Sequence, residues 1–187
     1  MHHLNIVDVE ATCWEGEPPA GETSEIIEIG VCVVDTLRWE RVARHRILVR
    51  PTRSRVSSFC TDLTGLAQSD VDSGLSFADA CEQLRKELRS DSRAWASWGD
   101  YDRKQFERQC AASAVAYPFS VRHTNLKARF SEILGLRKRL GMAQALAHLN
   151  LPLEGRHHRG DDDAWNIGAI AIELPKRSGL PESPRLV

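Results

Sequence analysis

The sequence lacks the cysteine pattern of a disulfide-rich or zinc-binding protein. Its 187 residues include five cysteines, an odd number, scattered and without any CxxC pair. That pattern argues against a disulfide framework and a cysteine-based zinc site, and it favours a reducing compartment. We therefore expect a cytoplasmic protein.

The sequence also lacks long apolar segments and an excess of charge of one sign. No signal peptide opens the chain, and no apolar run approaches the ~20 residues that a membrane span requires. The formal net charge is −1, so bulk charge does not draw the chain to nucleic acid. We expect no membrane association, and no protein partner is predictable.

No internal repeat or long linker divides the chain, and its 42% hydrophobic content fits one domain with a proper core. We expect this domain to span residues 1–174. The remaining residues, 175–187, carry glycine and proline and are expected to form a loosely ordered tail.

Positive charge is concentrated locally, in seven arginines between residues 38 and 55. Two interpretations are open for this stretch. It is either a solvated strand and loop or an edge that tracks phosphates, and the second makes binding salt-dependent. The arginines are Arg38, Arg41, Arg44, Arg46, Arg50, Arg53 and Arg55.

Apolar periodicity predicts an α/β fold with a mixed sheet flanked by helices. Runs rich in β-branched or alternating residues predict strands at 3–9, 26–35, 41–50, 94–98 and 121–126. Amphipathic or capped segments predict helices at 57–66, 76–89, 101–112, 126–134 and 139–149. A last helix is expected from the aspartate run near residue 161 to Leu174.

Two carboxylates, Asp8 and Glu10, end the first predicted strand. Side chains two apart on a strand share a face, so the two acids repel each other unless a cation lies between them. A solvated strand end is the alternative. Because ligands of open α/β sheets bind at the carboxyl ends of strands, we favour a cation site here.

A third acid follows the predicted strand at 94–98, where Asp100 and Asp102 compete. Asp100 stands at the expected helix N-cap. Asp102 shares a helical face with Phe106 and Cys110, the face that should pack on the sheet. We therefore assign Asp102 to the cation site and Asp100 to capping.

The run of three aspartates near the end supplies the fourth acid. Asp163 shares a stripe with Ile167 and Ile170, the face expected to cover the sheet. Acidic residues also favour the positive end of a helix dipole. We assign Asp163 to the cation site and Asp161 or Asp162 to helix capping.

A histidine pair lies in the glycine-bearing loop before this run. His158 lies five residues before Asp163, and an imidazole with a pKa near ~6.5 can accept a proton at neutral pH. We set its neighbour His157 aside. Four carboxylates that converge beside one imidazole suit phosphodiester hydrolysis assisted by two divalent metal ions.

Five segments together resemble the DEDDh 3′→5′ exonucleases. Within this family the chain looks most like the exoribonuclease branch that trims the 3′ ends of histone mRNA, small interfering RNA and ribosomal RNA. The similarity runs from about residue 4 to residue 174. The segments are DVEATC at 8–13, SEIIEIG at 24–30, FCTDLTGL at 59–66, WGDYD at 98–102 and GRHHRGDDDAWNIGAIA at 155–171.

The resemblance implies a ribonuclease H-like fold and a catalytic centre with two magnesium ions, for which manganese is an alternative. By motif, the metal ligands correspond to Asp8, Glu10, Asp102 and Asp163, and the general base to His158.

The resemblance also implies a site for the terminal nucleotide. Phe59, Leu63 and Tyr101 stand where the family holds the terminal base, while Ala11 and Thr12 stand where it grips the terminal sugar. Tyr101 replaces a more familiar tryptophan, and its ring can still stack on a base.

The expected function is that of a 3′→5′ exoribonuclease acting on single-stranded RNA ends or short 3′ overhangs, with nucleoside 5′-monophosphates as products. Three alternatives stay open. One is a proofreading-type 3′→5′ exonuclease acting on single-stranded DNA, and another is a catalytically inactive nucleic-acid-binding module. The third is a metal-dependent phosphoesterase that acts on mononucleotides or small phosphate esters and leaves oligomers uncut. We expect no additional nucleic-acid-binding domain, such as the one that precedes the nuclease in animal relatives.

Overall fold

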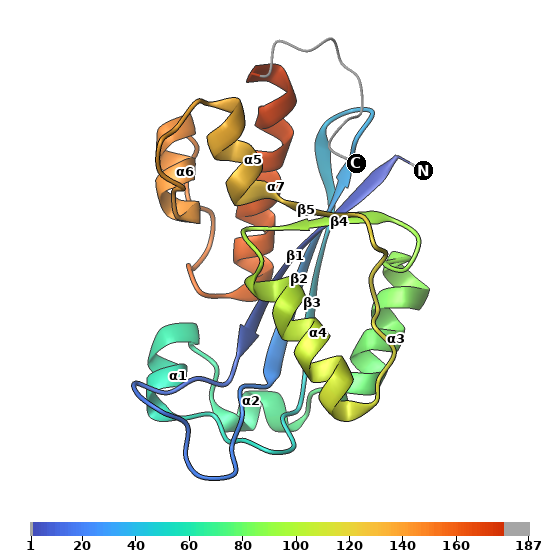
Figure 1. Cartoon of the computed structure of the whole chain (residues 1–187), viewed down its shortest axis with the longest axis vertical. Coiled ribbons are helices and arrows are strands. Elements are labelled where there is room, and N and C mark those ends of the chain that lie inside the picture. Colours follow the sequence, from blue (N-terminus) through green and yellow to red (C-terminus); the bar gives the residue numbers. More distant parts are fainter. Residues whose placement is uncertain (1, 178–187) are drawn as a thin grey trace.

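The computed structural model describes residues 2–177, and its centre is one mixed sheet (Figure 1). The five strands are β1 (His3–Ala11), β2 (Ile26–Asp35), β3 (Glu40–Leu48), β4 (Ala94–Ser97) and β5 (His123–Asn125). Their order across the sheet is β3-β2-β1-β4-β5. The β1–β2 and β2–β3 pairs are antiparallel, while β1–β4 and β4–β5 are parallel. The predicted mixed five-stranded sheet is confirmed.

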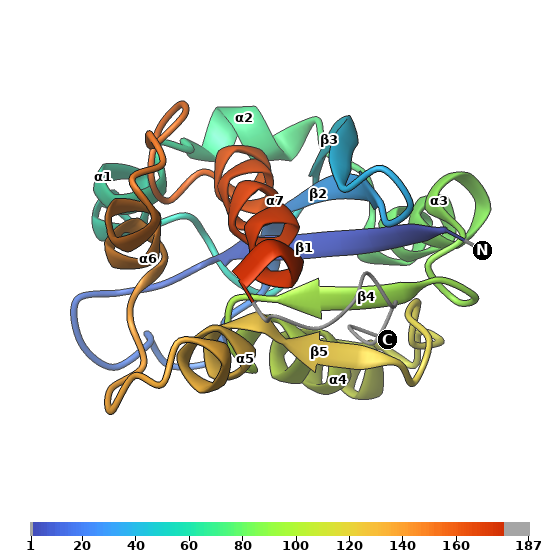
Figure 2. The same ribbon diagram turned by 90° about the horizontal axis from the view of Figure 1, so that it is seen from above.

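Helices cover both faces of the sheet (Figure 2). They are α1 (Ser58–Thr64), α2 (Gln68–Asp72), α3 (Phe77–Leu88), α4 (Tyr101–Ser113), α5 (Leu126–Ile133), α6 (Met142–Leu149) and α7 (Gly160–Arg177). One apolar core joins α5, α6 and α7 to the sheet, and another joins α3 and α4 to its opposite face. Two short helices, α1 and α2, lie beyond the carboxyl end of β1 (Figure 1).

The central strand β1 is apolar on both faces because helices cover both. Leu4 and Ile6 belong to the core under α7, whereas Val7 and Val9 belong to the core under α3 and α4. Side chains alternate along a strand, so Asp8 continues the face of Leu4 and Ile6. The strand itself therefore aims this acid at the side of the sheet that α7 covers.

Two glycines bring the first turn of α7 against β2. A Cβ atom added to Gly30 would lie 1.9 Å from the carbonyl oxygen of Gly160, so this contact admits no side chain. The same helix approaches β2 again at Gly168, where an added Cβ would lie 2.6 Å from the Cys32 sulfur. This close approach fixes where the aspartates at the start of α7 emerge.

The sequence missed one helix and misplaced the end of another. The five-residue helix α2 falls in a stretch for which the sequence predicted no element. Helix α7 continues through Pro175 to Arg177, beyond the predicted end at Leu174. The rest of the predicted tail, 178–187, lies outside the described residues, and the division at 174 stays a prediction.

Among residues 2–177, none of the helices combines the length and apolar character of a bilayer-spanning segment. All five cysteines are free. The cytoplasmic location expected from their pattern stays a prediction.

Candidate active site

A cavity of about 410 Å³ lies at the carboxyl end of β1. Its lining includes all four acids that the sequence assigns to a cation site, although they come from three different elements. We call these residues the acidic cluster: Asp8 and Glu10 of β1, Asp102 of α4 and Asp163 of α7.

The carboxylates of the cluster are close enough to share a cation. Ligand oxygens of Asp8, Glu10 and Asp163 all lie within 4.8 Å of one another. Asp8 is half-buried, whereas Glu10 and Asp163 are buried. No lysine or arginine is among the residues that line the cavity.

Asp102 joins the cluster from the first turn of α4. It is buried, and its Oδ1 accepts a hydrogen bond of 3.0 Å from the amide of Val9, which ties α4 to β1. Phe106 packs in the core, as the stripe predicted. Asp100 occupies the N-cap position, but its side chain makes no capping hydrogen bond and instead accepts one of 2.8 Å from Asn125 Nδ2. The capping role expected of Asp100 was therefore wrong.

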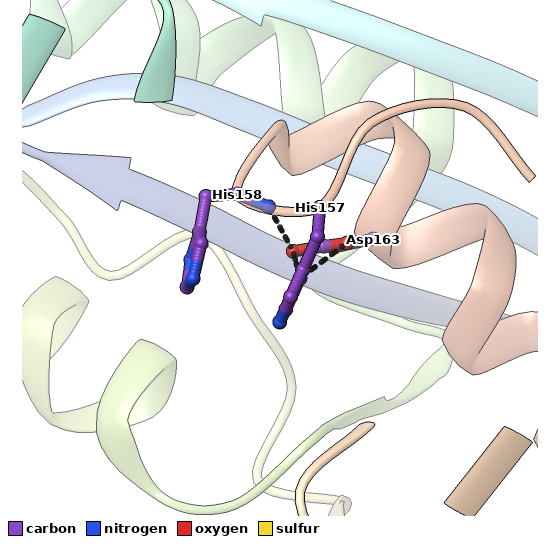
Figure 3. A group of neighbouring side chains, drawn as sticks. All are labelled: His157, His158 and Asp163. Atoms are coloured by element: carbon purple, nitrogen blue, oxygen red, sulfur yellow. Dashed lines mark hydrogen bonds and ion pairs between the residues drawn. The ribbon is translucent and has the colours of Figure 1, made fainter. Parts of the chain in front are cut away.

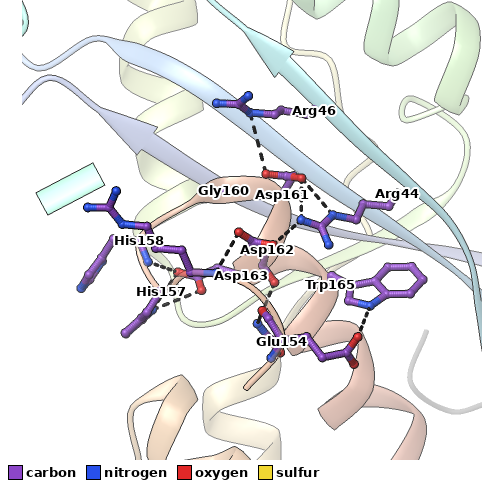
Figure 4. Close-up of polar contacts among 12 residues, drawn as sticks. Arg44, Arg46, Glu154, His157, His158, Gly160, Asp161, Asp162, Asp163 and Trp165 are labelled. Carbon is purple, nitrogen blue, oxygen red and sulfur yellow. Dashed lines mark hydrogen bonds and ion pairs between the residues drawn. The ribbon is translucent and has the colours of Figure 1, made fainter. Parts of the chain in front are cut away.

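The three consecutive aspartates of α7 lie in two different surroundings (Figure 4). Asp163 lines the cavity. Asp161 accepts a hydrogen bond of 2.9 Å from Arg44 Nε, and Asp162 forms an ion pair with the same guanidinium. Asp162 also accepts a bond of 3.0 Å from the Arg156 amide, outside the helix. The side chains expected to cap the helix thus bind an arginine of β3.

Two further arginines of the predicted basic stretch also bind acids. Arg41 pairs with Glu154 at 2.8 Å, and its guanidinium lies 4.1 Å from the centre of the Trp165 ring. Arg46 forms an ion pair with the fully buried Glu28. With Arg44, these side chains fasten the loop before α7 and the start of α7 to the sheet edge, a role that neither interpretation of the stretch anticipated.

Glu28 supports the start of α7 directly. It faces Glu10 across the β1–β2 pair, and its Oε2 accepts a hydrogen bond of 2.8 Å from the Gly160 amide. The Arg46 guanidinium neutralises its charge. Glu28 is therefore a structural acid immediately behind the cluster.

Both histidines of the loop before α7 contact Asp163 (Figure 3). His157 Nδ1 lies 2.9 Å from Asp163 Oδ2, and the His158 amide donates to the same oxygen at 3.0 Å. The two rings stack with centroids 4.0 Å apart, and His158 has a left-handed backbone with φ of +65°. Both line the cavity, and the choice of His158 over His157 as the general base stays a prediction.

Burial, together with mutual repulsion, raises the pKa values of the carboxylates in the cavity. Burial, with the charges of Asp102 and Glu10, raises the pKa of Asp8 well above its ordinary value. Burial, with the charges of Asp163 and Glu28, raises the pKa of Glu10 to about 8. Burial also raises the pKa of Asp102 to about 6. A divalent cation would relieve this repulsion.

The electrostatic surroundings of His158 differ from those of the carboxylates. Burial and the neighbouring His157 ring lower the pKa of His158 below its ordinary value. The ring is therefore neutral at pH 7 and has a nitrogen available to accept a proton. Burial raises the pKa of Asp163, opposed by the charge of His157.

Two of the three residues expected to hold a terminal base line the cavity. Leu63 of α1 and Tyr101 of α4 do so, and the Tyr101 side chain is 57% exposed. Phe59 lies one helical turn before Leu63, is 39% exposed and is outside the lining of the cavity. All three side chains are exposed enough to contact a ligand.

The two residues expected to grip a terminal sugar differ from each other. Ala11 lines the cavity. Thr12 is fully buried; its amide donates to the Glu25 carbonyl at 2.8 Å, and its hydroxyl accepts from the Glu25 amide at 2.9 Å. The amide and hydroxyl of Thr12 are therefore engaged inside the protein, and the structure lends its predicted contact no support.

Comparisons with known proteins identify the family of this chain. The family model described as "Exonuclease" matches residues 6–171. The chain belongs to this exonuclease family. The 3′-5′ exonuclease Snipper of Drosophila melanogaster is 29% identical over 200 residues, which cover 95% of this chain and 71% of Snipper.

Two further comparisons, one of sequence and one of structure, show the same relationship. Human 3′-5′ exoribonuclease 1 is 31% identical over 182 residues, which cover 92% of this chain and 52% of the human protein. The chain thus spans about half the length of that relative. The crystallographic structure of the nuclease domain of 3′hExo, a DEDDh family member bound to rAMP, superposes with a TM-score of 0.86 at 29% identity, covering 96% and 95% of the two chains.

These matches confirm the DEDDh resemblance and the ribonuclease H-like fold. The exonuclease is a nuclease of the hydrolase class, and its family depends on divalent metal ions. The acidic cluster offers only carboxylate oxygens, the ligands that magnesium and manganese prefer. The residues present therefore fit divalent metal.

Several residues that line the cavity of this exonuclease were missed by sequence reasoning, among them Trp98, Cys13 and Met142. Trp98 had a signal, since it belongs to the WGDYD segment that supplies Tyr101 and Asp102. Met142 had none, because it comes from α6, a helix that the sequence predicted without any role in the site.

Proposed function

We propose that the chain is a 3′→5′ exoribonuclease that removes nucleoside 5′-monophosphates from single-stranded RNA ends or short 3′ overhangs. The observation that carries the proposal is the convergence of four carboxylates and two histidines on a cavity lined by no lysine or arginine. The similarity to 3′-5′ exoribonucleases and to a nuclease domain bound to rAMP supports a ribonucleotide substrate.

The acidic cluster would hold two divalent ions, for which we propose magnesium, with manganese as the alternative. When bound, such ions neutralise charge on the scissile phosphate and lower the pKa of an attacking water. Asp8 and Glu10 are held by β1, Asp102 by its bond to Val9, and Asp163 by the start of α7.

The remaining roles fall to the residues around the cluster. We assign to His158 the removal of a proton from the attacking water, because its ring is neutral and lines the cavity. In-line attack on the last phosphodiester expels the 3′-oxygen of the preceding nucleotide and releases a nucleoside 5′-monophosphate. The terminal base would stack on the Tyr101 ring and contact Leu63.

A time course on a 5′-labelled single-stranded RNA tests this proposal. With Mg²⁺ or Mn²⁺ we expect a ladder that shortens by one nucleotide at a time from the 3′ end, and with chelator no shortening. A parallel time course on DNA of the same sequence measures the preference for the 2′-hydroxyl, the group by which proteins distinguish RNA from DNA.

The alternatives predict different outcomes of these time courses. Faster shortening of DNA than of RNA would identify a DNA exonuclease. RNA that is bound but uncut with either metal would identify an inactive nucleic-acid-binding module. Internal cleavage, in place of a ladder, would contradict the exonuclease proposal for this chain.

A further inference from the structure

A second depression adjoins the candidate active-site cavity. It has a volume of about 340 Å³ and shares two aromatic residues, Trp98 and Tyr101, with that cavity. Its other lining residues are Gly99, Asp100, Asn125, Lys127 and Arg139. A ligand that fills the cavity and extends past the two rings therefore enters this depression.

The charge changes sign between the two hollows. The cavity holds the acidic cluster, whereas the depression offers Lys127 in the first turn of α5 and Arg139 in the loop before α6. Within residues 2–177, neither cation pairs with an acid or donates a side-chain hydrogen bond. Arg137 and Lys138 are exposed beside Arg139 and likewise carry no ion pair there.

The one acid of the depression is already neutralised. Asp100 accepts a hydrogen bond of 2.8 Å from Asn125 and pairs with Arg103 at 3.4 Å. The depression thus contains two unpaired cations and one carboxylate that is already paired, and this net positive charge suits an anionic ligand. Phosphate is the anion that a nucleic-acid strand presents at every nucleotide.

The Trp98 ring, part of the wall that the two hollows share, is held by a hydrogen bond and by packing. Trp98 Nε1 donates to the Leu140 carbonyl at 3.2 Å, and its ring meets the edge of Phe130 with centroids 5.7 Å apart. Gly99, next to it, has φ of +123°, and a Cβ there would meet nothing within 4 Å. An indole fixed in this way suits base stacking, and the open backbone leaves room for a sugar and phosphate.

We propose that Trp98, Lys127 and Arg139 form a second-nucleotide site, which receives the base and phosphate on the 5′ side of the terminal nucleotide. This rests on the proposed exonuclease function, because the terminal nucleotide must occupy the adjoining cavity. The RNA strand then leaves the active site over α4 and α5. The alternative path runs over Arg53 and Arg55, which are exposed but line neither hollow.

Binding of a 5′-fluorescein RNA octamer, measured by anisotropy in calcium at several salt concentrations, tests the site. We expect Lys127→Ala/Arg139→Ala to weaken binding at least about tenfold and to reduce the salt slope by about 1.4, since each single-strand phosphate contact contributes about 0.7. The matched control, Arg53→Ala/Arg55→Ala, removes the same charge but should bind like the wild type.

Hydrolysis of a nucleoside 5′-monophosphate p-nitrophenyl ester, which lacks a second nucleotide, separates binding from folding. The Lys127→Ala/Arg139→Ala loss should appear with the octamer and not with this ester. Equal loss with both substrates, unchanged octamer binding, or a greater loss in the Arg53→Ala/Arg55→Ala control would overturn the second-nucleotide site. If the wild type binds the octamer through Lys127 and Arg139 but cleaves nothing, the exonuclease proposal fails while this site stands.

Discussion

Two groups of carboxylates meet at the first turn of α7, and they differ in what neutralises them. One group, Glu28, Asp161 and Asp162, faces the sheet edge and binds Arg44 and Arg46 of β3. The other is the acidic cluster, which faces a cavity without lysine or arginine. Asp162 and Asp163 are adjacent in the sequence and belong to different groups.

The comparison separates acids that hold the fold from acids that await a ligand. A paired buried carboxylate has its charge compensated by the protein itself. No lysine or arginine lies in the cavity of the cluster, and burial, with the charges of Asp163 and Glu28, raises the pKa of Glu10 to about 8. A divalent metal ion, on which the family depends, would compensate these charges.

The largest expected effect comes from removing an acid of the cluster. Asp163→Asn should lower metal-dependent RNA cleavage at least about 10³-fold, because it removes a metal ligand at the reacting phosphate. Asp161→Asn is the matched control, and its activity should stay within a few-fold of wild type. Equal losses in the two variants would remove the distinction between the groups. Full activity of Asp163→Asn, or of Asp8→Ala, would rule out the metal scheme.

The two histidines allow a finer comparison inside the cavity. His158→Ala should slow cleavage about 10²-fold or more with metal binding largely kept, because a general base contributes that much. His157→Ala should cost less, since its ring contacts Asp163 and is given no proton transfer. The check is the pH–rate profile of each variant. A profile left unchanged by His158→Ala would show that another group is the base.

Breaking the ion pairs between arginine and the group of Glu28, Asp161 and Asp162 should affect stability more than catalysis. Arg46→Ala leaves the carboxylate of Glu28 buried and uncompensated, and we expect a loss of about 2–3 kcal/mol in the free energy of unfolding. Urea unfolding measures this loss. The exposed Arg38 provides the control, since Arg38→Ala should change stability by less than about 0.5 kcal/mol. Glu28→Gln added to Arg46→Ala should recover part of the loss.

A further expected effect is a pH dependence of stability. In the metal-free protein the pKa of Glu10 is about 8, against an ordinary value of 4.5. The folded state therefore keeps a proton that the unfolded state releases, so this contribution to stability is full below pH 4.5 and is lost as pH rises through about 8.

Divalent metal should reverse this trend. Metal binds the deprotonated carboxylates, so the rise in Tm on adding Mn²⁺ should grow between pH 6 and pH 8. Thermal unfolding of the wild type and of Glu10→Gln measures it. A metal effect that is the same at both pH values in the wild type would show that the cluster carries no raised pKa.

Much of the site could be predicted from local periodicity. Alternation along β1 places Asp8 and Glu10 on one face, and the stripe from Asp102 to Phe106 and Cys110 turns Asp102 inward. Both inferences need only the spacing of side chains on one element, together with a sheet that must be covered. The placement of these acids in one cavity follows from them.

The arginine pairing could not be predicted in the same way. Arg44 and Asp161 are 117 residues apart, and no local pattern states which acid a strand arginine will reach. The loop before α7 posed a related problem, because His158 adopts a left-handed backbone with positive φ. Spacing along the chain does not encode that backbone angle.

Manganese in a crystal of this protein tests the central claim most directly. Anomalous difference density should appear among the carboxylates of Asp8, Glu10, Asp102 and Asp163, with none beside Asp161 or Asp162. Density confined to the arginine-paired acids, or no density at full manganese saturation, would contradict the account.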